Sequence, residues 1–598
     1  MPVNRMYFRG GKTPILLAAL LLLSAIGSLA LGMQSNAEQE SPPAWARGMV
    51  WYQIFPERFR NANHENDPGG WDLSSVEWDQ PLTVPTAQEI EAHWFRVAAE
   101  PTRFRSSPDR SGGAGMDTIF QRRYGGDLQG VYEKLADLAA MGVTGIYLCP
   151  VFESRSLHKY DAWDHRHIDP TLGHPARYDD PGPVPVLLKD TEDPADELTW
   201  DWTPADTWFV EVFLPKAKSL GLRVVLDGVW NHTGLGHFAF HDVRERGSDS
   251  PFADWFETRF DEDGRLIGWR SWNGVNGSLP VFRQIDGDLA PGPKAHMMAV
   301  TRRWMDPNGD GDPSDGIDGW RLDVANEIGR RFWKDWREEV RRINPEALII
   351  GEIWFDAEDY FDGTAFDAQM NYPAAYVLAD WLSIGGPLRG DATVAADRLR
   401  RVFHHDRAHD LVQFNLISSH DTERIASLMM NQSERGFDTG ARPWEEGSGY
   451  ITGAPDRVAM QRCLMAYAAL VAMPGSVMVY NGDEFAMPGA DDPLNRAPIQ
   501  WDQFTEEPGD FFVAVAYLLQ LRSDQGLASL FQEGDVHWAS ENEGRTLLIR
   551  RTLGERSIEF RITPDSAVEG APGFAQSFFD GWFSVRVLDG QRWSRIVP

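Results

Sequence analysis

Two acidic side chains and one arginine are spaced so that they could act together on a substrate. Arg321 and Asp323 are two residues apart in IDGWRLDVA, so a strand would present both on one face. Glu352 ends the apolar segment ALIIGEIW. Two carboxylates at the ends of consecutive parallel strands can cleave a glycosidic bond, because one attacks the sugar carbon while the other protonates the leaving oxygen. For either acid alone, a buried ion pair would be the simpler interpretation.

The elements that must position these residues follow from the surrounding pattern. WKDWREEVRRI, between the two acids, predicts a helix that ends at Asn344-Pro345. From Trp51 onward, strand-like and helix-like segments alternate, which is typical of a parallel sheet with helical crossovers. The expected strands are WYQIF at 51–55, GIYLCP at 145–150, RVVLDGV at 223–229, WRLDVA at 320–325, LIIGEIW at 348–354, FDAQMNY at 366–372, FNLISSH at 414–420 and VMVYNGDE at 477–484.

Eight successive strands predict an α/β fold, a closed (β/α)8 TIM barrel, with an open doubly wound sheet as the alternative. Between the second and third strands lies a Pro- and Asp-rich excursion too long for a simple connection. After about residue 523, TLLIRRTL, IEFRITP and FSVRVLDG predict short antiparallel strands. We therefore expect a barrel at 45–150 and 209–522, an inserted domain in a βα loop at 151–208, an extended loop within 60–123, and a small C-terminal β-domain at 523–598.

Composition excludes some functions. The 598 residues carry a net charge of −32, and phosphate binding needs a basic surface, so nucleic acid is not expected as a partner. The acidity is compatible with a neutral substrate. Cys149 and Cys463 are the only cysteines. They predict no disulfide framework, and the absence of CxxC spacing argues against a zinc mechanism.

The N-terminus has the pattern of a targeting segment. Arg5, Arg9 and Lys12 precede an uncharged, largely apolar run over 13–37. A positive region, an apolar region and small residues near the end predict a signal peptide at 1–37. The run is almost long enough to span a membrane, so a retained anchor is the alternative, and it is the only membrane contact expected. In both cases we expect export to the periplasm or the extracellular space.

Five segments resemble conserved regions of the α-amylase family of glycoside hydrolases, in their known order, over about residues 45–510. The segments are HKYDAWDHRHIDPTLG at 158–173, LDGVWNH at 226–232, GWRLDVANE at 319–327, GEIW at 351–354 and ISSHDTER at 417–424. ANE, GEIW and DDPLNR at 491–496 are most similar to the branch of cyclomaltodextrinases, maltogenic amylases and neopullulanases. The resemblance implies a barrel with an inserted domain after strand three and a C-terminal β-domain, and it makes GIYLCP strand two.

The resemblance also implies a role for each acid. Asp323 matches the nucleophile that forms a covalent glycosyl ester, and Arg321 would keep it ionised and aimed. Glu352 matches the general acid, which later acts as the base that activates water. Asp421 matches a third carboxylate, which grips sugar hydroxyls as the ring distorts.

Substrate-binding residues are implied in the same way. His232 and His420 match the family's substrate-binding histidines, and Tyr160 matches the tyrosine that stacks under the sugar ring being cleaved. Trp354 would lie on the leaving-group side. Two residues of DDPLNR resemble the pair that grips the sugar beyond the cleaved one, namely Asp492 and Arg496.

The chemistry itself is expected to need no cofactor, but one loop could hold calcium. Asp306, Asn308 and Asp310 fit the first half of an EF-hand-like loop, in which alternating oxygens meet the ion. The twelfth position is Ile317 where that motif has a bidentate glutamate. A turn-rich acidic loop without an ion is therefore the alternative.

The sequence predicts a retaining hydrolase that cleaves α-1,4 bonds in maltodextrins, cyclodextrins or starch. A transglycosidase of the same fold, or an enzyme acting on sucrose or trehalose, is the first alternative. The second is a non-catalytic glucan-binding or membrane-scaffold protein, but such relatives lose the carboxylates that this chain keeps. Members of the branch commonly carry an N-terminal β-domain, which we expect to be missing because WYQIF follows the targeting segment closely.

Overall fold

The computed structural model describes residues 41–67, 75–86, 119, 122–173, 187–431, 443–445, 448–502, 509–564, 583–589 and 592–595. The expected signal peptide or anchor at 1–37 lies outside these residues, as does much of the loop expected within 60–123, and both stay predictions. Within the part that the structure describes, no helix has the length and apolarity that crossing a membrane requires.

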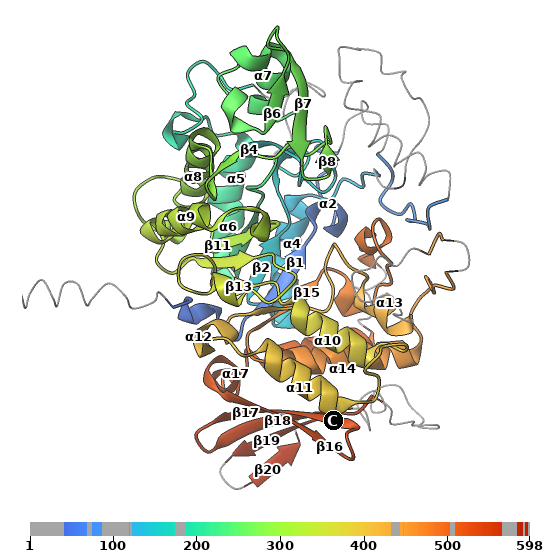
Figure 1. Ribbon diagram of the computed structural model, residues 1–598. Helices are drawn as coiled ribbons and strands as arrows, with labels where there is room; N and C mark the ends of the chain where they lie inside the picture. Colours follow the sequence, from blue (N-terminus) through green and yellow to red (C-terminus); the bar gives the residue numbers. More distant parts are fainter. Residues whose placement is uncertain are drawn as a thin grey trace, which may run out of the picture. The chain divides into compact units, whose positions relative to one another are not determined.

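Eight parallel strands form the central barrel (Figure 1). They are β1 (Val50–Ile54), β2 (Gly145–Leu148), β5 (Arg223–Gly228), β11 (Gly319–Leu322), β12 (Leu348–Gly351), β13 (Ala368–Gln369), β14 (Phe414–Asn415) and β15 (Ser476–Tyr480). Their order in the sheet is β13-β12-β11-β5-β2-β1-β15-β14. A parallel bridge between Met370 and Phe414 joins the two outer strands. The predicted barrel is therefore confirmed, and each of the eight expected segments supplies one strand.

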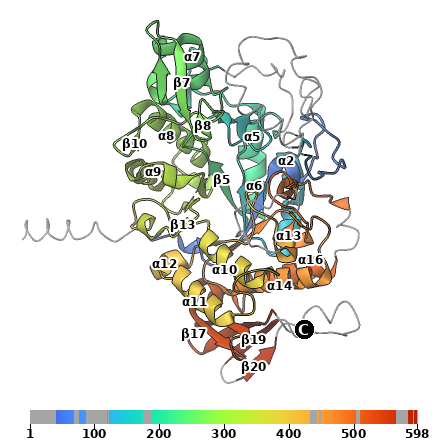
Figure 2. The ribbon, with the colours of Figure 1, turned by 45° about the vertical axis from the view of Figure 1, so that its right-hand side comes forward.

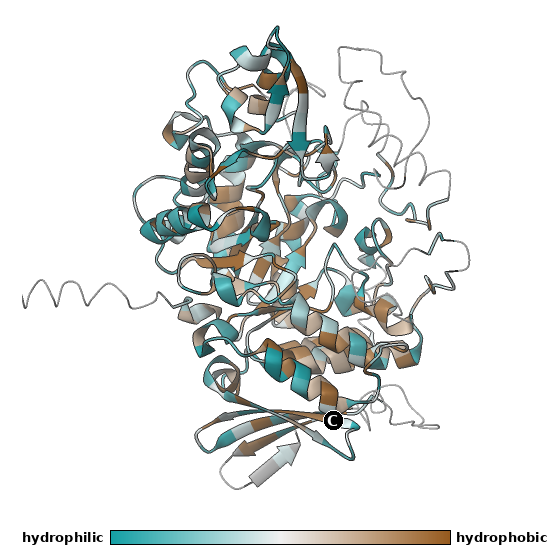
Figure 3. Ribbon diagram, viewed as in Figure 1, coloured by the Kyte–Doolittle hydropathy of each residue, from teal (hydrophilic) through white to brown (hydrophobic). Residues whose placement is uncertain are grey.

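Burial explains why short apolar runs form these strands. Every residue of β1, β2, β11, β12 and β15 is buried, as expected for parallel strands covered on both faces. Figure 3 shows hydrophobic colouring in the central strands and hydrophilic residues on the outer faces of several surrounding helices. The helices around the barrel include α4 (Leu128–Met141), α8 (Pro291–Met305), α9 (Arg330–Ile343), α10 (Tyr372–Leu382), α11 (Ala392–Val402), α12 (Arg407–Asp410), α13 (Ile425–Met430), α14 (Arg457–Ala472) and α16 (Asp510–Gln520).

Local signals set the ends of the helices that precede catalytic or core strands. The side chain of Asp127 caps α4 by accepting the Gly130 N–H, and Gly142 ends it with φ 103°, a left-handed conformation that suits glycine. The helix expected between the two acids is α9, and it ends at Asn344 as predicted, because the residue before a proline disfavours helical geometry.

Two long connections interrupt the barrel on the side where strands end. After β2, the described residues of 151–208 hold the hairpin of β3 (Phe152–Ser154) and β4 (Ala162–Ile168). After β5, a second excursion holds α7 (Phe238–Arg246), a three-stranded sheet of β6 (Thr258–Phe260), β7 (Leu266–Ser271) and β8 (Gly274–Val275), and the pair β9 (Gln284–Ile285) and β10 (Asp288–Leu289). β5 is the third barrel strand, so this excursion has the position that the family resemblance implies for an inserted domain.

The boundary expected at 208/209 falls inside a continuous helical run. α5 (Pro204–Trp208) leads into a π-helical turn, η5 (Phe209–Phe213), and then into α6 (Leu214–Ser219). The Phe209 N–H donates to carbonyls of α5, so the hydrogen-bond ladder does not stop there. This run is the crossover helix that delivers the chain to β5, and its first turn belongs with the barrel.

A five-stranded antiparallel sheet follows the barrel, as predicted from the C-terminal strands. It contains β16 (Asp535–Glu541), β17 (Thr546–Leu553), β18 (Arg556–Ile562), β19 (Phe583–Asp589) and β20 (Arg592–Arg595), after the short helix α17 (Ala528–Glu533). The sheet packs against α11 and α14, on the side of those helices away from the barrel strands (Figure 2). This packing leaves the ends of strands β11 and β12 free of the terminal sheet.

Candidate active site

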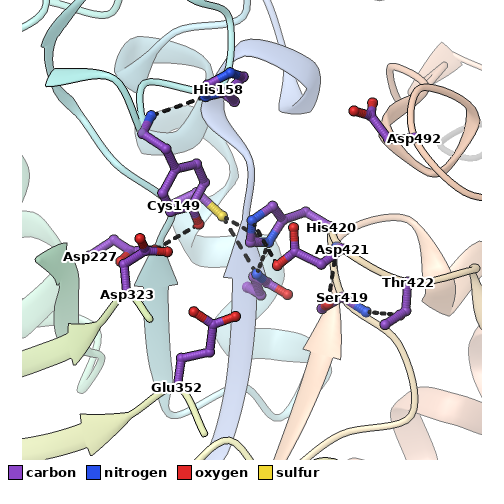
Figure 4. Close-up of polar contacts among 12 residues, drawn as sticks. Cys149, His158, Asp227, Asp323, Glu352, Ser419, His420, Asp421, Thr422 and Asp492 are labelled. Carbon is purple, nitrogen blue, oxygen red and sulfur yellow. Dashed lines mark hydrogen bonds and ion pairs between the residues drawn. The ribbon is translucent and has the colours of Figure 1, made fainter. Parts of the chain in front are cut away.

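Three acids predicted from the sequence follow barrel strands. Asp323 directly follows β11, Glu352 directly follows β12, and Asp421 comes shortly after β14. β11 and β12 are neighbours whose last residues, Leu322 and Gly351, pair in register, so the next residue of each strand stands beside the other. Asp323 is 7% exposed and Glu352 5%. In Figure 4 the three carboxylates point toward a shared space.

Arg321 connects the acids. Its guanidinium donates to both oxygens of Asp227 at 2.8 and 2.9 Å and to Asp323 at 3.1 Å, and it lies 3.0 Å from a carboxylate oxygen of Glu352. Tyr147 also donates its hydroxyl to Asp227, at 2.5 Å. A single buried cation therefore fixes carboxylates from three adjacent strands.

Asp227 and Tyr147 were not predicted as site residues, although a signal existed for the first. Asp227 lies in the LDGVWNH segment and pairs in register with Arg321 across neighbouring strands. Residues paired in this way project to the same side of a sheet, so an acid there was the natural partner for Arg321. Nothing in the sequence around Tyr147 distinguishes it from a core residue.

The charges at this cluster do not balance. Burial and the neighbouring Glu352 raise the pKa of Asp323 well above its usual range, and Arg321 opposes this shift. The cation thus acts in the direction expected from the sequence, but burial and the second acid outweigh it. With three carboxylates around one guanidinium, the surroundings favour the protonated form of Asp323.

Asp323→Asn should stabilise the protein. A carboxyl whose pKa is raised by folding binds its proton more tightly in the native state. Native stability then falls as the pH rises above the unfolded-state pKa of about 3.9. At pH 7 the amide should raise the free energy of unfolding, because it replaces a carboxyl whose charged form is disfavoured by burial and by Glu352. The gain should vanish below about pH 4, where the carboxyl is protonated in both states.

The measurement is the melting temperature of both proteins from about pH 4, where the gain should vanish, to about pH 8. Asp263→Asn is the matched control, since Asp263 lies in an exposed turn and pairs with Arg265 at the surface. A variant that melts lower than the parent protein at pH 7 would show that Asp323 stabilises the native state.

Glu352 is held by two donors. The Val324 N–H donates to Oε2 at 2.8 Å, and the Trp354 indole donates to Oε1 at 3.0 Å. Trp354 stacks face to face on Tyr372, with ring centroids 3.7 Å apart. Val324 has φ +40°, a left-handed conformation that costs a β-branched residue about 1–3 kcal/mol. This strained residue directly follows Asp323, so the backbone turn that orients one acid also fixes the other.

Tyr160 and His420 form a parallel pair beside the acids. Their rings are 5.2 Å apart with an interplanar angle of 5°, and the Tyr160 hydroxyl donates to Asp227 at 2.9 Å. The side-chain amide of Gln53 lies 2.9 Å from His420 Nδ1, and His420 Nε2 lies 3.2 Å from Asp421. Burial lowers the pKa of His420 well below its usual value, so the ring is neutral and can donate from Nε2.

Arg496 joins Asp421 to Asp492. It lies 3.3 Å from the first carboxylate and 3.2 Å from the second, and its Nε donates to the His420 carbonyl at 2.9 Å. Figure 4 shows the side chain of Asp492 apart from the three predicted catalytic acids. The pair predicted from DDPLNR is therefore brought together, and through Arg496 it reaches the rim of the acid cluster.

His232 lies beside an aromatic side chain of the excursion after β5. It is buried, its pKa is lowered by burial to about 4, and its ring is nearly parallel to that of Trp272 at 5.8 Å. In the described part of the chain no hydrogen bond or ion pair joins His232 to the three acids. Trp272 comes from the excursion after β5 and is 49% exposed, so it offers an apolar surface next to a residue that the sequence predicts to bind sugar.

The loop predicted to hold calcium lies away from this site. Its oxygens accept amides of the same loop: Asp306 from Gly311 at 3.0 Å and Asn308 from Asp310 at 2.8 Å. The loop follows α8 and precedes β11, so it belongs to the barrel face opposite the strand ends. An ion there would stabilise the loop without reaching substrate, and calcium stays a prediction.

Known proteins resemble this chain over most of its length. The model of the α-amylase catalytic domain matches residues 53–180 and 208–519. The chain is 28% identical to a maltogenic α-amylase of Bacillus acidopullulyticus over 555 residues, covering 89% of this chain and 74% of the relative. It is 29% identical to neopullulanase 2 of Thermoactinomyces vulgaris over 528 residues, covering 88% and 70%.

A solved structure agrees with these sequence matches. The cyclic α-maltosyl-(1→6)-maltose hydrolase of Arthrobacter globiformis, in complex with that sugar, superposes with a TM-score of 0.64 at 25% identity, covering 93% of this chain and 99% of the other. The matched family model includes every barrel strand except the first few residues of β1, together with the acids described above. This chain therefore belongs to the α-amylase family and is a glycoside hydrolase.

Proposed function

We propose that this protein is a retaining α-glucan hydrolase that cleaves α-1,4 bonds in maltodextrins or cyclodextrins by double displacement. The observation that carries the proposal is the Arg321 guanidinium, which contacts Asp227, Asp323 and Glu352 at once. It keeps two carboxylates of neighbouring strands together at one edge of the barrel. The relatives named as maltogenic amylase and neopullulanase support an α-glucan as substrate.

In the first step, an oxygen of Asp323 attacks the anomeric carbon and forms a glycosyl ester. The bond from that carbon to the glycosidic oxygen breaks, and this oxygen takes the proton of Glu352. Asp323 must be ionised to attack, so in this mechanism Glu352 is the acid that transfers the proton to the leaving oxygen. Arg321 stabilises the carboxylate that remains on Asp227 and balances the charge that moves between the two acids.

In the second step, ionised Glu352 removes a proton from water, and the water oxygen attacks the anomeric carbon. The ester bond to Asp323 breaks, so the carboxylate is regenerated and the substrate's anomeric configuration is restored. Asp421, with His420 and Arg496 beside it, is placed to bind hydroxyl groups of the same sugar.

The test uses maltoheptaose and β-cyclodextrin with the purified protein. NMR of the first product should show the α-anomer, because two inversions restore the configuration. Chain-length analysis should show maltooligosaccharides shorter than the substrate. An initial β-anomer would contradict the double displacement. Products longer than maltoheptaose would assign the site to transglycosylation, and no turnover of either sugar would contradict an α-1,4-glucan substrate.

A further inference from the structure

Three histidine rings from distant segments meet inside the protein, apart from the acid cluster. His165 is on β4, His237 directly precedes α7, and His296 is on α8. All three are buried, and their ring centroids are 5.6–6.2 Å apart. One nitrogen of each ring lies within 4.8 Å of the other two. Figure 1 shows β4, α7 and α8 in the same half of the molecule, above the barrel strands.

The hydrogen bonds of the rings leave one nitrogen of each ring without a partner within the residues that the structure describes. His165 Nε2 lies 3.2 Å from the Val229 carbonyl, and His296 Nδ1 lies 2.7 Å from the Pro194 carbonyl. A carbonyl can only accept, so these nitrogens carry the ring protons and the opposite ones keep lone pairs. Among the described residues, His165 Nδ1, His237 Nε2 and His296 Nε2 are buried without a hydrogen-bond partner. Unpaired buried polar atoms destabilise a protein unless a ligand satisfies them.

The surroundings keep the rings neutral. Aromatic side chains pack around His296, with Trp200, Trp255 and Phe238 at centroid distances of 5.5, 5.6 and 5.3 Å. Burial lowers the pKa of His165 to about 4 and that of His296 to about 3. Their lone pairs are therefore available to a cation at neutral pH.

The charged groups next to the rings favour a cation. Arg166 is a positive group that acts on His237 and His296, and it is ion-paired with Asp164 at 2.6 Å and with Glu192 at 2.7 Å. Two carboxylates and one guanidinium leave a net negative charge beside the three neutral rings.

We propose that His165, His237 and His296 bind one divalent transition-metal ion of the Zn²⁺ class. Three neutral imidazoles without a carboxylate suit such ions rather than calcium or magnesium. Zn–N bonds are about 2.0–2.1 Å, so nitrogens within 4.8 Å of one another could close on a tetrahedral ion with shifts of less than about 1 Å per ring. His165 and His296 each donate a ring N–H to a backbone carbonyl, and histidines that bind a metal ion usually make such a hydrogen bond with their other nitrogen.

One ring must change its tautomer. His237 Nδ1 accepts the Ala239 N–H at 3.3 Å, which places the ring proton on Nε2. Binding a metal through Nε2 moves that proton to Nδ1 and opens this long contact. The fourth ligand would be solvent. Because β4, α7 and α8 belong to the two excursions and to the barrel wall, the ion would fasten both excursions to the barrel.

The experiment uses the whole protein after dialysis against a chelator, titrated with Zn²⁺ by calorimetry and with Co²⁺ by visible spectroscopy. We expect one Zn²⁺ per chain, tetrahedral Co²⁺ absorption bands, and a higher melting temperature with metal. His296→Gln should weaken Zn²⁺ binding by more than about 100-fold, because loss of an outer partner alone costs about 10–100-fold. The variant should also lose the Co²⁺ bands.

His404→Gln is the control, because His404, His405 and Asp356 form the other described cluster that could hold an ion, and they are partly exposed. If His296→Gln does not fold, as judged by circular dichroism, His237→Gln replaces it. Equal Zn²⁺ binding by the parent protein and the folded histidine variant would overturn the proposal. A parent protein that binds no Zn²⁺ would also overturn the proposal. The two lone pairs and one N–H of the three rings would then hold a buried water.

Discussion

Asp323→Ala should lower turnover of maltooligosaccharides by about 10⁴-fold or more, because no other carboxylate can form the glycosyl ester. Asp227 is held by Arg321, Tyr147 and Tyr160, so it cannot replace the missing nucleophile. Sugar binding should persist, since Asp421, His420 and Arg496 are unchanged. Turnover is measured by reducing-sugar release, and binding by calorimetry with β-cyclodextrin.

Azide tests the role of the removed group. With α-maltosyl fluoride as substrate, azide can enter the space left by the carboxylate, attack the anomeric carbon and expel fluoride. The product should be the β-maltosyl azide, because this single displacement inverts the configuration. Asp263→Ala, in an exposed turn, should keep full activity. Near-normal turnover by Asp323→Ala, or an α-azide as its product, would contradict the assignment of Asp323 as nucleophile.

Glu352→Gln should lower turnover of maltooligosaccharides by about 10²–10⁴-fold, the usual contribution of a general acid or base. The amide oxygen can keep one of the two hydrogen bonds, from Val324 or from Trp354, while the NH2 group faces the other donor; the side-chain size is unchanged. Aryl maltosides with acidic leaving groups need no proton from the enzyme in the first step. Their first step should stay fast while the second becomes slow, and a burst of aryl alcohol should appear in stopped-flow absorbance.

Azide should again discriminate the roles. In Glu352→Gln the glycosyl ester on Asp323 still forms, so azide attacks from the opposite side and gives the α-maltosyl azide. Glu358→Gln, six residues later in an exposed turn, is the matched control and should behave as the parent protein. Equal losses on maltooligosaccharides and on aryl maltosides would show that Glu352 does not protonate the leaving group.

The fold was predictable because its strands are buried on both faces. Such strands appear in the sequence as short apolar runs between helical patterns, and all eight were placed correctly, down to the two-residue strands β13 and β14. An insertion after β5 was implied only by the family resemblance, and its strands were not located in the sequence, because they are short and partly exposed and show little alternation. The predicted domain boundary at 208/209 cut through a helix for a similar reason, because the Pro- and Asp-rich sequence of the excursion continues into the first turn of that helix.

The acids were predictable for a different reason. Arg321, Asp323 and Glu352 sit at strand ends, where chemistry in a barrel takes place, and their spacing is visible in the sequence. Their energetic setting was not visible: Asp227 competes for the same guanidinium, and Val324 adopts a left-handed conformation. The three-histidine cluster could not be foreseen at all, since its members are 72 and 59 residues apart along the chain (237 − 165 and 296 − 237) and share no motif.

The pairing of β1 with β15 has a consequence for biosynthesis. Trp51 lies opposite Met478, so the second edge of β1, the first of the eight barrel strands, stays uncovered until β15, the last of them, has been synthesised. Until then an apolar strand edge can associate with other nascent chains. The nucleophile and the acid are translated long before the ring of strands can close around them. A product terminated before Tyr480 would therefore carry both of these acids, yet it would be a target for chaperones and proteases rather than an enzyme.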